Sequence, residues 1–156
     1  MATWEKKIRS GGGNDLQPGE TLVGGVLLNP PGTTGKMLAR GSGGLLGAVL
    51  HDKFGTDGEA AEFVSDSGVA AQIPDEPVWF AVTPTRVLVW GHSTMSGKPK
   101  GLKLTLGRHD LERVEVEKLR TTYATVLHFS DGTARIFEAP KMMNDPVGFA
   151  AAVNGG

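Results

Sequence analysis

Residues 125–138 read Thr-Val-Leu-His-Phe-Ser-Asp-Gly-Thr-Ala-Arg-Ile-Phe-Glu, and this stretch decides the fold. Two runs of apolar and β-branched residues, 125–129 and 133–138, flank the turn Ser130-Asp131-Gly132. An Asp-Gly pair between two such runs is a strong signal for a β-hairpin, because both residues tolerate the backbone conformation of a tight turn. The stretch therefore predicts two antiparallel strands late in the chain.

The chain before this hairpin predicts further strands of the same kind. Residues 78–83 and 86–91 are apolar runs joined by a Pro-Thr turn. Apolar and polar residues alternate over 102–106 and around 114–117, which is the period of a strand with one buried face. Residues 21–28 form an apolar run that ends at an Asn-Pro-Pro-Gly turn. About seven short strands with turns between them predict an antiparallel sheet.

A helix is predicted at the C-terminal end of the chain. Asp145 is followed by Pro146, and proline fits the first position of a helix. The apolar residues of 147–153 could close the open end of a curled sheet. The expected fold class is mainly β (α+β): a curled antiparallel barrel of about seven strands, capped by a C-terminal helix, with a glycine-rich insertion after the first strand.

The insertion covers residues 29–77. Its first half, 36–54, mixes leucines with glycines, whereas residues 55–76 carry six acidic residues and no lysine or arginine. We expect the acidic half to be a solvated loop. The predicted organisation is an N-terminal helical arm, 1–15, and one domain, 16–153, which the insertion interrupts.

The N-terminal arm is predicted to be a short helix. Thr3 is a candidate for its N-terminal cap, and Trp4 and Ile8 share one face. The glycines at 11–13 are expected to end the helix. Two isolated turns are not stable in water, so the arm has to dock on another surface.

Composition excludes several classes of protein. The formal net charge is −1, whereas a domain that neutralises many phosphates of a nucleic acid is usually basic. The chain has no cysteine, which excludes disulfides, thiolate metal sites and cysteine nucleophiles. No apolar run reaches signal-peptide length or the roughly 20 residues of a membrane-spanning helix. We therefore expect a cytoplasmic protein without a transmembrane segment that does not bind nucleic acid.

Four short motifs together resemble the bacterial pleckstrin-homology-like (PH-like) family. Residues 16–20, LQPGE, resemble its opening L-x-P-G-E, and residues 82–89, VTPTRVLV, resemble its second hairpin. Residues 110–116, DLERVEV, and 126–132, VLHFSDG, resemble two later strands of the family. The order of seven strands and a capping helix is also similar. The insertion 29–77 departs from the family, in which this connection is expected to be short.

The resemblance implies a binding or assembly module, since some bacterial relatives form ring-like oligomers. Phosphoinositide-binding PH domains use a basic loop between the first two strands. Here that loop has only Lys36, Arg40 and Lys53 before its acidic part, so specificity for lipid headgroups is not carried over.

Sequence motifs for catalysis are weak. Residues 29–37, NPPGTTGKM, have the Gly-Lys pair of a phosphate-binding loop, but Pro30 and Met37 occupy the positions that need glycine and Ser or Thr. The four histidines are scattered without metal-ligand spacing. A Ser–His pair brought together in space stays open. We expect no enzyme activity, no cofactor, no catalytic residue and no metal site.

Two groups of residues are candidate contact sites. Gly43 and Gly47 have the spacing that lets helices approach closely, with Leu46 and Leu50 beside them, and they are candidates for self-association. Two other readings of this segment stay open: a glycine-rich loop whose leucines pack against the barrel, or a weak peripheral contact with a membrane.

The second group is basic. Lys98 and Lys100 lie in the one compact basic loop, and together with Lys36 and Arg40 they are candidate contacts for an anion or an acidic partner. The predicted partners are therefore a second copy of the chain or another protein. The alternative is a lipid headgroup or another anionic ligand.

Overall fold

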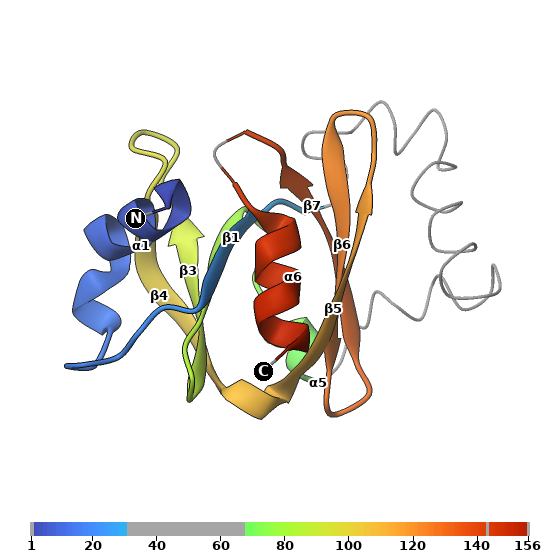
Figure 1. Ribbon diagram of the computed structural model, residues 1–156, viewed down its shortest axis with the longest axis horizontal. Helices are drawn as coiled ribbons and strands as arrows, with labels where there is room; N and C mark the ends of the chain where they lie inside the picture. The colour runs from blue at the N-terminus through green and yellow to red at the C-terminus, as the bar shows by residue number, and fades with distance from the viewer. Residues whose placement is uncertain (1, 31–67, 143, 156) are drawn as a thin grey trace, which may run out of the picture.

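The computed structural model describes residues 2–30, 68–142 and 144–155. Within these ranges, seven strands form two antiparallel sheets (Figure 1). Sheet A has the order β1-β2-β3-β4, and sheet B has the order β5-β6-β7. The strands of sheet A are β1 (Gly24–Leu28), β2 (Val78–Val82), β3 (Arg86–His92) and β4 (Pro99–Gly107). Those of sheet B are β5 (Leu111–Lys118), β6 (Thr122–Phe129) and β7 (Ala134–Pro140).

Three helices accompany these sheets in the described ranges: α1 (Thr3–Gly12), α5 (Gly68–Gln72) and α6 (Pro146–Asn154). Short 3-10 turns follow α1 at Gly13–Asp15 and connect the two sheets at Arg108–Asp110. The mainly β class, the antiparallel pairing and the C-terminal helix are confirmed. The side chain of Asp145 accepts a hydrogen bond from the Gly148 amide, and this cap with Pro146 explains why α6 begins there.

The central core lies between the two sheets. It is one cluster of buried apolar side chains that includes Val26, Phe80, Leu127, Phe137 and Phe149. The ring of Phe80 meets those of Phe137 and Phe149 edge to face, with centroids 6.1 and 6.3 Å apart. These contacts join sheet A, sheet B and α6 in one interior.

Two asparagines fasten α6 to the edges of both sheets. Before the helix, the Asn144 amide accepts from the Leu27 N–H of β1 and donates to the Leu27 carbonyl. At its last residue, the Asn154 amide makes the same pair of bonds with Val114 of β5. Each asparagine side chain therefore makes the two backbone hydrogen bonds that a neighbouring strand would otherwise make at that edge. Directly between the sheets there is one backbone bridge on the described residues, Asn29 with Glu138.

Helix α1 covers the outer face of sheet A, where a second cluster lies (Figure 1). We call it the outer core; it consists of Ile8, Leu22, Trp79, Ala81, Leu88 and Trp90. The prediction that the arm docks through Ile8 and Trp4 is met by this packing, since Trp4 also lies against the cluster.

One detail of the predicted arm is wrong. The residue at the N-cap is Ala2, and Thr3 is already in the helix. The last residue of α1 is Gly12 and its C-cap is Gly13, so the prediction that the glycines at 11–13 end the helix is confirmed. Gly11 and Gly12 also permit a close approach to sheet A. A Cβ on Gly12 would come within 2.6 Å of the Trp90 ring, so only glycine fits there without a shift.

The acidic half of the insertion, residues 55–76, was expected to be a solvated loop, and this expectation is wrong for the last part of that half. Residues 68–72 form α5, and Ala70 and Ile73 are buried in the central core. The Arg135 guanidinium donates to the carbonyls of both residues at 2.8 Å. A short apolar run and one cation therefore order this segment in spite of the acidic composition around it. The preceding part of the insertion, 31–67, lies outside the described residues.

Candidate functional site

Three loops lie at the same end of the molecule (Figure 1). They connect β3 to β4, β5 to β6, and β7 to α6. We call this region the loop end and define it as residues 93–100, 117–121, 141–142 and 144–145. It contains the two predicted basic residues that the structure describes, Lys98 and Lys100, and both side chains are exposed.

The remaining predicted site residues lie outside the described residues. They are Lys36 and Arg40 of the anion group, and Gly43, Leu46, Gly47 and Leu50 of the self-association group. Of the four residues predicted to contact an anion, the structure therefore describes only Lys98 and Lys100, which lie in one loop. Self-association through the glycine-rich segment stays a prediction, which light scattering on the full chain would check.

The β3–β4 loop is held in one shape by hydrogen bonds. The Gly97 amide donates to the Ser93 carbonyl at 2.7 Å, and the Ser93 amide donates to the Lys98 carbonyl at 2.9 Å. The indole N–H of Trp79 donates to the Gly97 carbonyl at 3.2 Å. Gly97 has φ +72°, a conformation that favours glycine. This scaffold presents Met95, which is 98% exposed.

Helix α1 adds a further cation to this loop. The Lys7 ammonium lies 3.1 Å from the position that a Cβ on Gly97 would take. Burial, and then the positive charge of Lys7, lower the pKa of His92 below its usual value. His92 is therefore held neutral near pH 7, and the positive charge of this region comes from its lysines.

A second basic group at the loop end was not predicted from the sequence. The Lys141 ammonium donates to the carbonyls of Leu119 and Arg120, at 2.7 and 2.9 Å. It also lies 5.6 Å from the centre of the Tyr123 ring. These contacts tie the β7–α6 loop to the β5–β6 loop, where Arg120 and Lys118 are exposed. Met142, next to Lys141, is 82% exposed.

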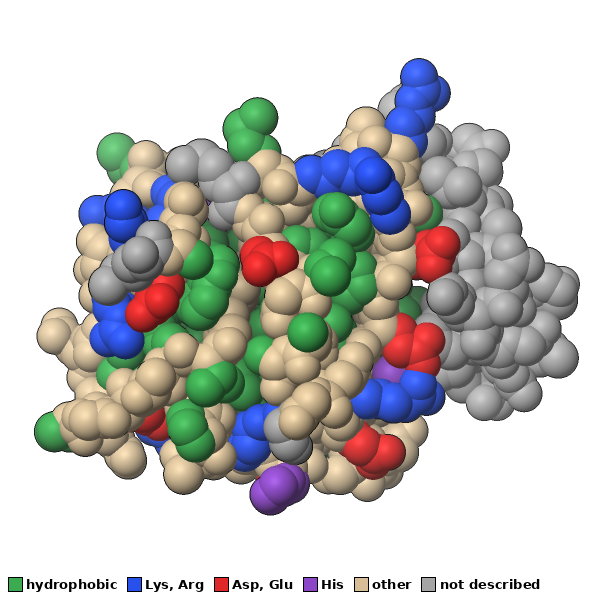
Figure 2. Space-filling model, viewed as in Figure 1, with side chains coloured by type: hydrophobic (Ala, Val, Ile, Leu, Met, Phe, Trp, Pro, Cys, Tyr) green, Lys and Arg blue, Asp and Glu red, His purple; other side chains and the backbone are tan. Residues whose placement is uncertain are grey.

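Positive charge predominates at the loop end. Five basic residues lie there, against the acidic pair Glu117 and Asp145. The basic residues are Lys98, Lys100, Lys118, Arg120 and Lys141. Figure 2 shows blue Lys and Arg side chains and protruding green hydrophobic side chains along this edge of the molecule. The whole chain has a net charge of −1, so this is a local concentration of positive charge.

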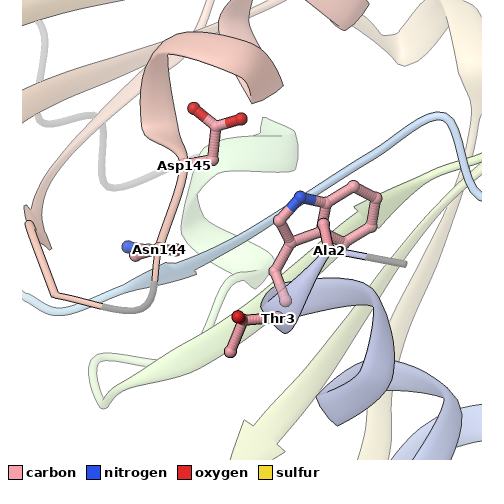
Figure 3. A pocket seen from close by; sticks show the side chains of 5 residues that line it. Ala2, Thr3, Asn144 and Asp145 are labelled. Atoms are coloured by element: carbon pink, nitrogen blue, oxygen red, sulfur yellow. The ribbon is translucent and has the colours of Figure 1, made fainter.

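A hollow of about 240 Å³ lies beside this end, between the starts of α1 and α6. In Figure 3, Thr3 and Asp145 lie on opposite sides of it. Two of its polar side chains already have partners, since Asp145 caps α6 and the Asn144 amide binds Leu27. The hollow is a joint between two helices, and its lining gives no reason to assign a ligand.

Two of the motifs behind the family resemblance meet in a partly buried ion pair. The Glu20 carboxylate, with 5% of its side chain exposed, accepts from Arg86 Nη2 at 2.5 Å and from Thr83 Oγ1 at 2.9 Å. The hydrogen bond from Arg86 lowers the pKa of Glu20 to about 2. All three polar groups satisfy one another, so these motif residues lock the segment before β1 to the β2–β3 turn. Their role in this chain is structural.

Other chemistry has little support in the described ranges. No group of three or more His, Asp or Glu side chains there is close enough to share a metal ion. Among the helices described, none has the length and apolar character needed to cross a membrane. No protein-family model matches this chain, and no curated protein matches it.

Proposed function

We propose that this chain is a non-enzymatic interaction module of the PH-like type that binds an anionic lipid surface through its loop end. The observation that carries the proposal is the pairing of exposed methionines with lysines. Met95 and Met142 are the two most exposed large apolar side chains among the described residues. Lys98 and Lys141 lie near them in the same two loops.

This pairing suits the boundary of a bilayer. Each Lys or Arg near an anionic membrane surface contributes about 1 kcal/mol of attraction. A methionine side chain that leaves water for the acyl region adds about 1.5–3 kcal/mol, and its flexible thioether adapts to an irregular surface. Neither contribution is large by itself, but several together give reversible peripheral binding. The order of seven strands and a final helix supports the PH-like assignment.

The proposal is tested by co-sedimentation with vesicles of phosphatidylcholine that contain phosphatidylserine. We expect the full chain to bind at low salt and to dissociate as the salt concentration rises, because counterions screen the attraction. Replacing Lys98→Gln and Lys100→Gln together should weaken binding about 30-fold, which corresponds to about 2 kcal/mol for two cations.

A charge-matched control separates this site from general electrostatics. Arg9→Gln with Arg113→Gln also removes two positive charges, but both arginines lie outside the residues that define the loop end, in exposed ion pairs. This control should bind the vesicles nearly as well as the wild type. The proposal fails if the wild type does not sediment with the anionic vesicles at low salt, or if both double variants weaken binding equally.

A further inference from the structure

The edges of the two sheets are not covered equally. Two open sheets have four edges, and within the described residues three of these edges have hydrogen-bonded partners. The Asn144 side chain binds the backbone of β1, and the Asn154 side chain binds that of β5. The backbone of Asn29 exchanges hydrogen bonds with β7. The fourth edge is β4, which pairs with β3 and with no other described strand.

The backbone of β4 has an unpaired donor and acceptor at this edge. The Thr83 amide donates to the Arg86 carbonyl across the β2–β3 turn, so the backbone polar groups of Arg86 face β2. These groups alternate in direction along an antiparallel strand, so those of the next residue, Val87, face β4 and pair with Leu106. The amide and the carbonyl of Thr105, one residue along, therefore point away from β3. Neither has a hydrogen bond to any described residue.

The side chains along this edge are accessible as well. Residues 100–103 and Thr105 are exposed, and Leu102 is 40% exposed. Helix α1 lies against the start of the strand, where Gly11 packs closely on Pro99. Strand β4 is nine residues long, and an exposed edge strand is a template on which another strand can pair.

The charge of β4 restricts which strand can pair with it. Residues 93–109 contain three lysines and one arginine and no acidic residue. Lys100 and Lys103 lie on β4, and neither forms an ion pair with a described residue. Like charges on neighbouring strands are destabilising, so a second copy of β4 is a poor partner. A strand with carboxylates would lie roughly 4.8 Å from β4, within reach of both lysines.

We infer that the open edge of β4 binds an acidic, extended segment of another protein as an added strand. The N–H and C=O of Thr105 extend the hydrogen-bond ladder, and Lys100 and Lys103 select carboxylates at alternate positions of the segment. Leu102 offers an apolar contact to the residues between them. The inference does not rest on lipid binding, because Lys103 and Thr105 lie outside the loop end.

The test uses the full chain and a synthetic peptide of alternating glutamate and valine that is blocked at both ends. A peptide with lysine in place of glutamate is the charge control. NMR measures the exchange of the Thr105 amide with solvent and the dissociation constant of each peptide. Thr105→Pro removes the donor at the open edge, and proline is tolerated there because no hydrogen bond to β3 is lost. Thr105→Val is the matched variant that keeps the donor.

We expect the acidic peptide to slow exchange of the Thr105 amide, and the lysine peptide not to bind. Thr105→Pro and Lys103→Gln should each weaken binding about fivefold, because each removes one polar contact. Thr105→Val should bind like the wild type. If Thr105→Pro does not fold, as judged by near-ultraviolet circular dichroism, the amide exchange of the wild type and the Lys103→Gln variant decide.

Three results would overturn the inference. In the first, the acidic peptide leaves the exchange of the Thr105 amide unchanged. In the second, the two peptides bind equally well, or Thr105→Pro and Lys103→Gln bind the acidic peptide as tightly as the wild type does. In the third, the Thr105 amide exchanges more slowly as the protein concentration rises without peptide, which would assign the edge to a second copy.

Discussion

Glu20 carries a charge in a place with little solvent, and its partners determine how it responds to pH. Hydrogen bonds from Arg86 lower the pKa of Glu20 from 4.5 to about 2. The stabilisation from the ionised form is therefore complete above about pH 4.5 and is lost as the pH falls toward 2. We predict that Glu20→Gln lowers the free energy of unfolding by about 2–4 kcal/mol at pH 7, since it leaves the half-buried Arg86 without its counterion.

Urea unfolding at several pH values measures this effect. The difference between the wild type and Glu20→Gln should shrink below pH 4.5, where the carboxylate begins to lose its advantage. The control is Glu5→Gln, which removes the exposed pair of Glu5 with Arg9 and should change stability by about 0.5 kcal/mol or less. Equal stability of the wild type and Glu20→Gln at pH 7 would refute the prediction.

His128, like Glu20, is favoured in its deprotonated form, but it responds in a different pH window. Its side chain is 12% exposed; burial, and then the charge of Arg113, lower the pKa of His128 from 6.5 to about 4. The fold therefore favours the neutral imidazole, and stability that is complete above pH 6.5 is lost as the pH falls toward 4. We predict that His128→Gln flattens the dependence of the unfolding midpoint on pH in this window. An NMR titration that gives His128 an ordinary pKa would contradict this.

At the scale of the element, the packing of α1 on sheet A depends on glycine at one position. Alanine is the better helix former by about 1 kcal/mol in a helix interior. Gly12 is the last residue of α1, so local propensity favours Gly12→Ala by less than this. The added Cβ would nevertheless lie 2.6 Å from the Trp90 ring. We predict that Gly12→Ala lowers the free energy of unfolding by about 1–3 kcal/mol, as other overpacked sites do. Gly13→Ala is the matched control, because nothing lies within 4 Å of its Cβ, and it should be neutral in the same urea titration.

Gly12 also shows which elements could be predicted from the sequence. The strands around 78–91 and 125–138 were predictable because their turns and alternation are local signals. The roles of Gly12 and of α5 were not, because each depends on a residue far along the chain. Gly12 contacts Trp90, and the carbonyls of α5 and the residue after it bind Arg135. The local pattern correctly marks Gly12 as a helix end, but it does not show the contact with Trp90, and it gives the α5 segment the signature of a loop.

At the scale of the whole molecule, the candidate site could likewise be predicted from the sequence only where its residues lie close together in the chain. Lys98 and Lys100 form a compact basic loop that the sequence shows directly. Lys141 joins the β5–β6 loop only because β6 and β7 pair with Thr122 opposite Pro140. No sequence spacing predicts that contact. The tertiary structure therefore extends a single basic loop into a surface at one end of the molecule.

If the whole loop end binds the membrane, cations outside the β3–β4 loop should also contribute to vesicle binding. Lys118→Gln with Arg120→Gln removes two exposed cations from the other side of the loop end, so it should weaken vesicle binding about as much as the Lys98 and Lys100 variant, near 30-fold. The four changes together should act additively in free energy, because the two pairs share no partner. Co-sedimentation at fixed low salt measures all three variants. If the Lys118 and Arg120 variant binds like the wild type, the contact is confined to the β3–β4 loop, and the loop end does not act as one surface.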